Sequence, residues 1–409
     1  MLRDTFLRIG YFGTSGAPLS TDIYGFAASS EKVRFLLVRT KSQISIDYFF
    51  ILVIIYHGNI FAQGRVEDKR IMGKIRVGVI GCGRISVMHL ASIKALEKLE
   101  LVAVCDVKKE RADEAAEKYS ARAYYDHKEM LDAEKLDAVH LCLPHYLHSS
   151  VAIDAFNHGV AVLTEKPMDV DLESAERAVS EAKRLGVQFG VIFQCRYNNA
   201  PRLVKSAIES GKLGKILSAR STLTWSRPDD YYCSSDWKGT WDKEGGGVVI
   251  DQAIHSIDLV NWIVDSEIES VCCGMANRGH KTMVVEDTAE GLITYKNGVK
   301  YGFYCMNNYG CDEPIEIRLY CEGGKAVFGY DDAYITYNDG TVEEAHPDTD
   351  LSDYGGGMGY WGLQHIRQIK QFYNALEGEE ELDISGERAL KTHRLIMKIY
   401  EIGKKQMGL

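Results

Sequence analysis

Short apolar runs alternate with amphipathic stretches between about residues 72 and 196. The runs are rich in β-branched residues and end at polar or glycine positions, which is typical of buried strands. The pattern predicts strands at 75–80, 101–105, 138–143, 160–164 and 187–193, and helices at 84–99, 108–118, 151–158 and 172–185. Strands that alternate with helices predict βαβ units, which form a doubly wound parallel sheet with helices on both faces.

The pattern changes after residue 196. A helix at 201–210 and an aromatic-rich loop come first, and a helix at 249–265 follows. Over residues 270–337 short segments alternate with period two and are separated by Asn, Asp and Gly turns, which predicts an antiparallel or mixed sheet. Two helices, at 362–376 and 386–404, close the chain. We therefore expect two domains, over 72–196 and 197–409.

Residues 1–71 differ from the rest because they show no clear amphipathic periodicity. Their one apolar run, at 48–56, is much shorter than the ~20 residues of a membrane-spanning helix. It also lies too far from the N-terminus for an ordinary signal peptide. We interpret 1–71 as an over-extended reading frame, with Met72 as the natural start. The alternatives are a membrane-associating or targeting extension and a small extra structural element.

Composition narrows the class of protein. The chain of 409 residues is 45% hydrophobic and 26% charged, as in soluble globular proteins. Its net charge of -10 disfavours a general nucleic-acid binder, and we expect no membrane partner. The 10 cysteines form no CxxC pair and many lie in apolar runs, so we expect reduced thiols, a cytoplasmic location and no metal site.

The glycine-rich turn at 81–86 (GCGRIS) follows the first predicted strand and opens a helix. In a βαβ unit, such a turn binds a dinucleotide pyrophosphate at the helix N-terminus. Asp106 ends the second strand at about the 20-residue offset at which an acid binds the ribose hydroxyls. The carboxylate would repel a 2′-phosphate, so NAD is favoured, with NADP as an alternative because Lys108 is near. The candidate cofactor residues of this part are Gly81, Gly83, Arg84, Ile85 and Asp106.

Two further strand ends carry polar residues, and strand C-termini line the ligand crevice of a parallel sheet. Pro144, His145 and His148 follow the strand at 138–143 and are candidates for contact with the cofactor. Glu165 and Lys166 follow the strand at 160–164 and are likewise candidates for contact with the cofactor. We expect Lys166 to orient a substrate hydroxyl or share its proton, Glu165 to pair with Lys166, and the bond before Pro167 to be cis.

A glycine triplet at 245–247 opens the helix that contains Asp251 and His255. These two residues are four apart, so they share one helical face. Oxidation of an alcohol needs a base for the hydroxyl proton, and histidine suits that role at neutral pH. We therefore expect His255 to act as the base and Asp251 to orient it or to bind a substrate hydroxyl. The alternatives are a surface pair or a structural metal pair, and no third metal ligand is evident.

Candidate substrate residues lie between the two domains and in the aromatic-rich loop. Aromatic faces beside charged side chains suit sugar rings, although loop packing or an oligomer contact would explain the same composition. The candidates are Arg196 and Asn198, after the last parallel strand, and Trp225, Arg227, Tyr231 and Trp237 in the loop.

Taken in order, these motifs resemble the glucose–fructose oxidoreductase / inositol dehydrogenase-like (Gfo/Idh/MocA) family. The resemblance covers about residues 74–405, including the segment 383–391 (DISGERALK). It implies an N-terminal Rossmann NAD(P)-binding domain and a C-terminal α/β domain with a large open, mostly antiparallel sheet for substrate and oligomerisation. It also implies Lys166 as the catalytic lysine and His255 with Asp251 as the catalytic pair.

The resemblance implies a dehydrogenase that acts on a CH–OH group of a sugar, polyol or nucleotide sugar, and a homo-dimer or homo-tetramer. One alternative is an enzyme that retains NAD and gives net hydrolysis or epimerisation. A catalytically silent binding protein is disfavoured, because both Lys166 and His255 are present.

Overall fold

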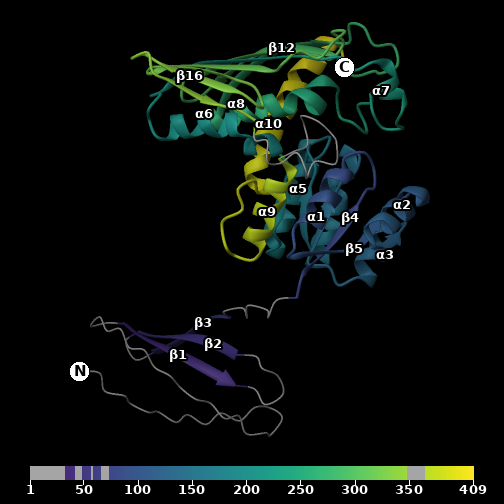
Figure 1. Cartoon of the computed structure of the whole chain (residues 1–409), viewed down its shortest axis with the longest axis vertical. Helices are drawn as coiled ribbons and strands as arrows, with labels where there is room; N and C mark the ends of the chain where they lie inside the picture. Colours follow the sequence, from purple (N-terminus) through teal and green to yellow (C-terminus); the bar gives the residue numbers. More distant parts are fainter. Residues whose placement is uncertain (1–32, 42–47, 57–58, 66–72, 348–363) are drawn as a thin grey trace. The chain divides into compact units, whose positions relative to one another are not determined.

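The computed structural model describes residues 33–41, 48–56, 59–65, 73–347 and 364–409 (Figure 1). Two units, Met1–Gly73 and Lys74–Leu409, are described separately. In the first, strands β1 (Val33–Lys41), β2 (Tyr48–Tyr56) and β3 (Asn59–Arg65) pair as an antiparallel sheet with β2 in the middle. The apolar run at 48–56 therefore forms a strand. Among the described residues, no helix is both long and apolar enough to cross a membrane.

The first sheet of the second unit is parallel throughout and has the strand order β6-β5-β4-β7-β8-β9. Its strands are β4 (Ile75–Ile80), β5 (Leu99–Cys105), β6 (Arg122–Tyr124), β7 (Ala138–Leu141), β8 (Ala161–Thr164) and β9 (Phe189–Val191). The connecting helices are α1 (Ser86–Ala95), α2 (Lys109–Tyr119), α3 (His127–Ala133), α4 (His148–Asn157) and α5 (Leu172–Leu185). This arrangement confirms the predicted doubly wound sheet. The sequence analysis missed β6 and α3, which are too short to show a period.

Alternation along the strands explains why helices cover both faces. In β4, Val77 and Val79 are fully buried in a cluster with residues of α1 and α2, whereas Ile80 belongs to a second cluster with residues of α3 and α4. Successive strand residues point to opposite faces, so a strand buried on both sides is apolar at every position. The apolar and glycine positions at 77–80, which are all buried, are therefore the expected sequence of a central parallel strand, and the charged Arg76 lies at its partly exposed start.

The second sheet has eight strands in the order β11-β12-β13-β10-β14-β15-β16-β17. The β10–β13 pair is parallel and the others are antiparallel. Helices α6 (Asn199–Glu209), α8 (Ile254–Val264) and α10 (Gly386–Met407) pack on one face (Figure 1). The strands are β10 (Ile216–Thr224), β11 (Ile268–Ala276), β12 (Thr288–Tyr295), β13 (Lys300–Met306), β14 (Glu316–Cys321), β15 (Gly324–Phe328), β16 (Ala333–Tyr337) and β17 (Val342–Ala345). The predicted fold class, including the open and mostly antiparallel second sheet, is confirmed.

The segment after the glycine triplet differs from the expected single α-helix. Its first turn, η3 (Val249–Ala253), is π-helical, and only α8 is α-helical. The glycines are required by packing, because a Cβ at Gly247 would lie 1.9 Å from the Glu286 carbonyl oxygen and one at Gly246 2.0 Å from the Tyr400 hydroxyl. A π turn spaces side chains differently from an α turn, so the expected alignment of residues four apart does not hold here.

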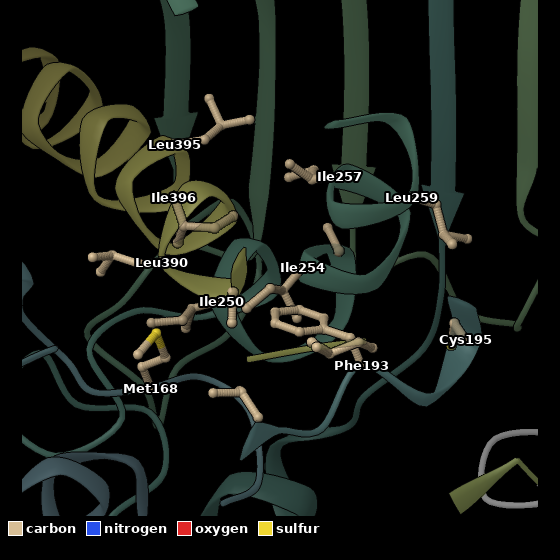
Figure 2. Close-up of a cluster of buried hydrophobic side chains, with 14 of the residues drawn as sticks. Met168, Phe193, Cys195, Ile250, Ile254, Ile257, Leu259, Leu390, Leu395 and Ile396 are labelled. Carbon is tan, nitrogen blue, oxygen red and sulfur yellow. The ribbon is translucent and has the colours of Figure 1, made fainter. Parts of the chain in front are cut away.

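A shared apolar core joins the two sheets (Figure 2). Met168 and Phe193, which follow β8 and β9, lie in one cluster with Ile250 and Ile254 of the η3–α8 segment and with Ile396 of α10. All five side chains are at most 2% exposed, and burial of this kind contributes roughly 1.5–3 kcal/mol for each large side chain. The loop that contains Lys166 is thereby fixed against the turn that contains Asp251.

Candidate active site

Lys166 and Asp251 meet where the parallel sheet contacts η3. The Lys166 Nζ donates to the backbone oxygen of Asp251 at 2.8 Å and to its Oδ1 at 3.3 Å. Both side chains are largely buried, at 14% and 11% exposed. The bond between Lys166 and Pro167 is cis, as expected. Lys166 thus lies at the carboxyl end of β8, where parallel α/β sheets bind their ligands.

The other carboxylate oxygen of Asp251 is crowded by donors. Oδ2 accepts from the Tyr231 hydroxyl at 2.9 Å, the Lys238 Nζ at 2.8 Å and the Gln252 side-chain amide at 2.7 Å. Burial opposes ionisation of Asp251, but the charges of Lys238 and Lys166 outweigh it and hold the pKa of the carboxyl well below its usual range. Asp251 is therefore an anion at neutral pH.

The expectation that Asp251 orients His255 is wrong in this structure. Among the described residues, the Asp251 carboxylate accepts hydrogen bonds from Lys166, Tyr231, Lys238 and Gln252, and the π turn accounts for the altered alignment with His255. His255 instead lies edge-on to the rings of Phe193 and Tyr330, and its Nδ1 is buried with no hydrogen-bond partner among the described residues. Burial, and then the charge of Lys166, lower the pKa of His255 to about 3. The ring is therefore neutral, which is the form of an imidazole that can accept a proton or a hydrogen bond.

Glu165 does not pair with Lys166, contrary to expectation. Its side chain points to the opposite side of the strand end, where Oε1 accepts from the Nε2 atoms of His89 at 3.0 Å and His365 at 2.9 Å. Burial opposes its ionisation, but these hydrogen bonds hold the pKa of Glu165 well below its usual range. Successive residues after a strand point to opposite sides, which explains why Glu165 and Lys166 diverge.

His89, His140, Glu165, His365 and Tyr373 form a buried network, which we call the histidine network. His89 Nδ1 lies 2.8 Å from His140 Nδ1, and His140 Nε2 lies 2.8 Å from the Tyr373 hydroxyl. Burial lowers the pKa values of His89 and His140, so both rings are neutral. For neutral rings, one set of tautomers satisfies every contact: Tyr373 donates to His140, His140 to His89, and His89 to Glu165.

The same atoms are close enough to hold a cation. One ligand atom each of His89, Glu165 and His365 lies within 4.8 Å of the others. However, the shared Glu165 oxygen already accepts from both rings at ordinary hydrogen-bond distance, which satisfies the carboxylate within the protein. We therefore assign the trio a structural role in fixing the strand end before Lys166.

The two histidines after β7 have different surroundings. His145, in the short helical turn η1 (His145–Leu147) that follows Pro144, donates from Nδ1 to the Glu244 carbonyl at 2.7 Å and lies edge-on to Trp237. Burial, and then the charge of Lys166, lower its pKa well below the usual range, so His145 is a neutral neighbour of the Lys166–Asp251 pair. His148 lies between the carbonyls of Leu143 and Pro167, at 2.9 and 2.6 Å, and thus braces the Lys166 loop.

The glycine-rich turn has the geometry that a dinucleotide requires. Gly81 has φ +96°, and a Cβ there would lie 2.2 Å from the Cys142 carbonyl oxygen. A Cβ at Gly83 would meet nothing within 4 Å, which leaves open space in front of the N-terminus of α1. Arg84 is exposed and Ile85 half-buried beside this space. The residues present therefore fit a bound pyrophosphate.

Asp106 lies beside this turn, as predicted. Its carboxylate accepts from the backbone N–H groups of Cys82 and Lys108, at 2.8 Å each. These bonds fix the carboxylate at the end of β5 and leave further lone pairs for ribose hydroxyls. The fixed negative charge disfavours a 2′-phosphate.

Two predicted substrate residues are engaged elsewhere, so the structure contradicts their expected role. Arg196 is buried and forms a bidentate ion pair with Asp258, at 2.7 and 2.6 Å. Burial opposes its charge, but Asp258 outweighs burial and raises the pKa of the guanidinium. Asn198 is also buried and donates its amide to the Tyr330 carbonyl at 2.7 Å. Both side chains support the fold.

The aromatic-rich loop divides into an inner and an outer part. Tyr231 and Trp237 lie in the inner part, beside Asp251 and His145 respectively. Trp225 is only 9% exposed and donates its indole N–H to the Glu313 carbonyl, so its ring is packed in the core, contrary to the expected open face. Arg227 stacks on Trp225 and pairs with Asp312, which makes it part of the outer loop.

Sequence reasoning missed Lys238, Glu244 and the histidine network. Lys238 lies within the aromatic-rich loop, directly after Trp237, and Glu244 directly precedes the glycine triplet. The buried ammonium of Lys238 contacts both Glu244 and Asp251. A lysine between aromatic residues, shortly before a predicted functional helix, was the available signal. The histidine network had none, because its members are spread from residue 89 to residue 373.

Comparison with known proteins agrees with this geometry. Residues 75–193 match the model of an oxidoreductase family with an NAD-binding Rossmann fold, and residues 202–327 match a GFO/IDH/MocA C-terminal domain. The chain is 30% identical to a myo-inositol 2-dehydrogenase of Thermotoga maritima over 76% of this chain and 91% of the relative. It is 27% identical to a D-glucoside 3-dehydrogenase of Escherichia coli, over 80% of this chain and 95% of the relative.

A solved structure of a dehydrogenase has a similar fold. The WlbA dehydrogenase from Bordetella pertussis, in complex with NADH and UDP-GlcNAcA, superposes with a TM-score of 0.71 at 29% identity. The match covers 81% of this chain and 97% of that one. The similarity therefore extends over both sheets of the second unit.

Proposed function

Since this chain belongs to the GFO/IDH/MocA family of NAD-dependent oxidoreductases, we propose that Lys166 and Asp251 handle the proton of its reaction. The enzyme transfers a hydride between the nicotinamide and a hydroxyl or keto carbon of a sugar, polyol or nucleotide sugar, in keeping with relatives named as dehydrogenases of such compounds. The relatives give no support to the alternative of a net non-redox enzyme. The proposed roles of Lys166 and Asp251 rest on their contact at the carboxyl end of β8.

Lys166 has the geometry to hold a substrate hydroxyl. Among the described residues, its ammonium donates only to two oxygens of Asp251, which leaves one N–H for a substrate. The bound NAD⁺ supplies the hydride acceptor. During oxidation, the Lys166 ammonium orients the hydroxyl and passes one of its protons to the Asp251 carboxylate as it takes up the hydroxyl proton, and in reduction the proton returns along the same path. His255, whose ring is neutral and whose Nδ1 has no hydrogen-bond partner among the described residues, is the second group proposed to accept a hydrogen bond or a proton from the substrate hydroxyl.

The cofactor residues are proposed on the same basis. Gly81, Gly83, Arg84 and Ile85 cradle the pyrophosphate, and Asp106 selects NAD through the ribose hydroxyls. Tyr231 and Trp237 border the substrate from the inner aromatic loop.

The test is a panel of sugars, polyols and nucleotide sugars, incubated with the protein and NAD⁺, with NADH fluorescence as the readout. We expect NADH to accumulate beyond one equivalent with at least one compound. An NADP⁺ series beside it tests the preference set by Asp106. If no compound yields NADH while sugar products form in the presence of bound NAD, the dehydrogenase assignment is overturned.

We also propose that copies of the chain associate and that the protein is cytoplasmic. The face of the second sheet that the helices leave uncovered exposes Leu292, Tyr304, Tyr320 and Tyr334, at 38–45%. A contiguous face of this kind favours association of copies into a homo-dimer or homo-tetramer, and a monomeric mass by light scattering would contradict it. All 10 cysteines are free thiols, which fits a cytoplasmic, reducing location.

A further inference from the structure

We propose that Lys238 is a positioning residue for the reaction: it holds one oxygen of Asp251 and so reserves the other for Lys166. This inference rests on the function proposed above, because it names what sets the geometry and charge of the Lys166–Asp251 pair. Nothing in the sequence patterns assigns Lys238 a role.

The contacts of Lys238 leave it no donor for a substrate. Its Nζ lies 2.8 Å from Asp251 Oδ2, 2.8 Å from the Tyr231 hydroxyl and 3.3 Å from Glu244 Oε1. A lysine ammonium has three N–H bonds, and these three oxygens use all of them. The side chain is 14% exposed. Lys238 therefore acts through its neighbours.

The two oxygens of the Asp251 carboxylate have different partners. Oδ2 accepts from Lys238, Tyr231 and Gln252, whereas Oδ1 faces Lys166. Rotating the carboxylate would break all the Oδ2 contacts together. Lys166 therefore meets an oxygen whose position is fixed before a substrate arrives, which is the condition for efficient proton handling.

Packing fixes the lysine itself. The Lys238 ammonium lies 4.5 Å from the centre of the Tyr231 ring and 4.8 Å from that of Trp237, and Trp237 packs in turn on His145. Cation–π contacts of this kind stabilise a buried ammonium. A methionine would fill much of the same volume between the rings while removing the charge.

The charged groups around Asp251 predict how the pH dependence of activity changes when Lys238 is replaced. Lys166, Lys238, Tyr231 and His145 face the carboxyl, and His255 and Glu244 lie just beyond, where burial raises the pKa of Glu244 to about 8. Burial raises the pKa of Asp251, and the charge of Lys238 is the largest effect that lowers it. Without Lys238 the pKa of Asp251 must rise. On acidification, the Asp251 carboxylate is then protonated at a higher pH than in the wild type. The acid limb of the pH–activity profile therefore moves to higher pH.

The experiment compares Lys238→Met, Lys238→Arg and the control Lys243→Met. The control removes a nearby lysine whose ammonium, among the described residues, donates only to the Asp236 carbonyl. In Lys238→Met we expect kcat to fall by about 10- to 100-fold with KM nearly unchanged. The acid limb should move up by about one pH unit, because a neighbouring opposite charge is lost. Lys238→Arg should restore part of kcat, and Lys243→Met should match the wild type. NAD⁺ binding should be unchanged in all three, whereas the thermal midpoint should fall in Lys238→Met, because Asp251 and Glu244 lose a buried charged partner, and should stay in place in Lys243→Met.

A second readout needs no substrate. The titration of Asp251 is followed by NMR of aspartate labelled with ¹³C at the carboxyl, and the signal is assigned by its absence in Asp251→Asn. The pH midpoint of the Asp251 titration should rise in Lys238→Met and stay in place in Lys243→Met. An unchanged titration midpoint of Asp251 overturns the inference, as does a pH-independent loss of activity, an effect on KM alone, or a loss of activity that disappears at temperatures at which Lys238→Met is fully folded. If the substrate panel fails for the wild type, the proposed function fails by itself while this titration still decides the role of Lys238.

Discussion

Lys166→Met should lower kcat by about 10³-fold, within the range that a positioned acid–base group contributes. The variant loses the ammonium that donates to Asp251 at 2.8 and 3.3 Å, and with it the N–H left for a substrate hydroxyl. NAD⁺ affinity should change little, because the glycine-rich turn and Asp106 are untouched. Steady-state NADH formation and NAD⁺ binding by fluorescence quenching measure the two quantities.

The matched control is Lys183→Met, which removes an exposed lysine of α5 that is paired only with Glu387 at the surface. It should keep the wild-type kcat. If Lys166→Met retained kcat within about threefold of the wild type, the proton-handling role of Lys166 would be wrong.

Arg196→Met should destabilise the protein by about 3–5 kcal/mol, because it leaves the Asp258 carboxylate buried without its charged partner. Asp258 is 1% exposed, and of its strong contacts only the hydroxyl of Thr392, at 2.7 Å, would remain. Urea unfolding at neutral pH, followed by circular dichroism, measures the change in the free energy of unfolding.

Loss of the ion pair and burial of an unpaired Asp258 carboxylate both lower the stability of Arg196→Met. The double variant Arg196→Met, Asp258→Leu separates these two effects. Replacing both partners with apolar residues should recover most of the lost stability, since the desolvation cost of both charges disappears as well. A single variant as stable as the wild type would return Arg196 to the list of candidate substrate residues.

The framework of the protein followed from its sequence, for physical reasons. The buried positions 77–80 of the central strand carry no polar side chain because helices cover both faces. Helix α5 has the predicted ends, with Asp171 as its N-cap and Gly186 in the left-handed conformation after it. Lys166, Asp251 and the glycine-rich turn were found because strand ends and glycines occur at fixed places in a parallel α/β sheet.

The errors concern which side chains meet. Arg196 looked free for a substrate because its partner Asp258 lies 62 residues further along the chain, where no local pattern links the two. The π turn at η3 has no period that a short window reveals, so the alignment of Asp251 with His255 was assumed to be α-helical. Lys238 reaches Asp251 only because the aromatic loop folds back, which depends on ring packing rather than on spacing.

The central claim is that Lys166 and Asp251 act as one unit in the reaction. Single-turnover formation of NADH by Lys166→Met, Asp251→Asn and the double variant tests it most directly. If the two act together, each single variant should lose about 10³-fold and the double variant little more, as for groups that work as a unit. A double variant whose loss equals the product of the single losses would show that the two residues act independently, and the account of the site would be wrong.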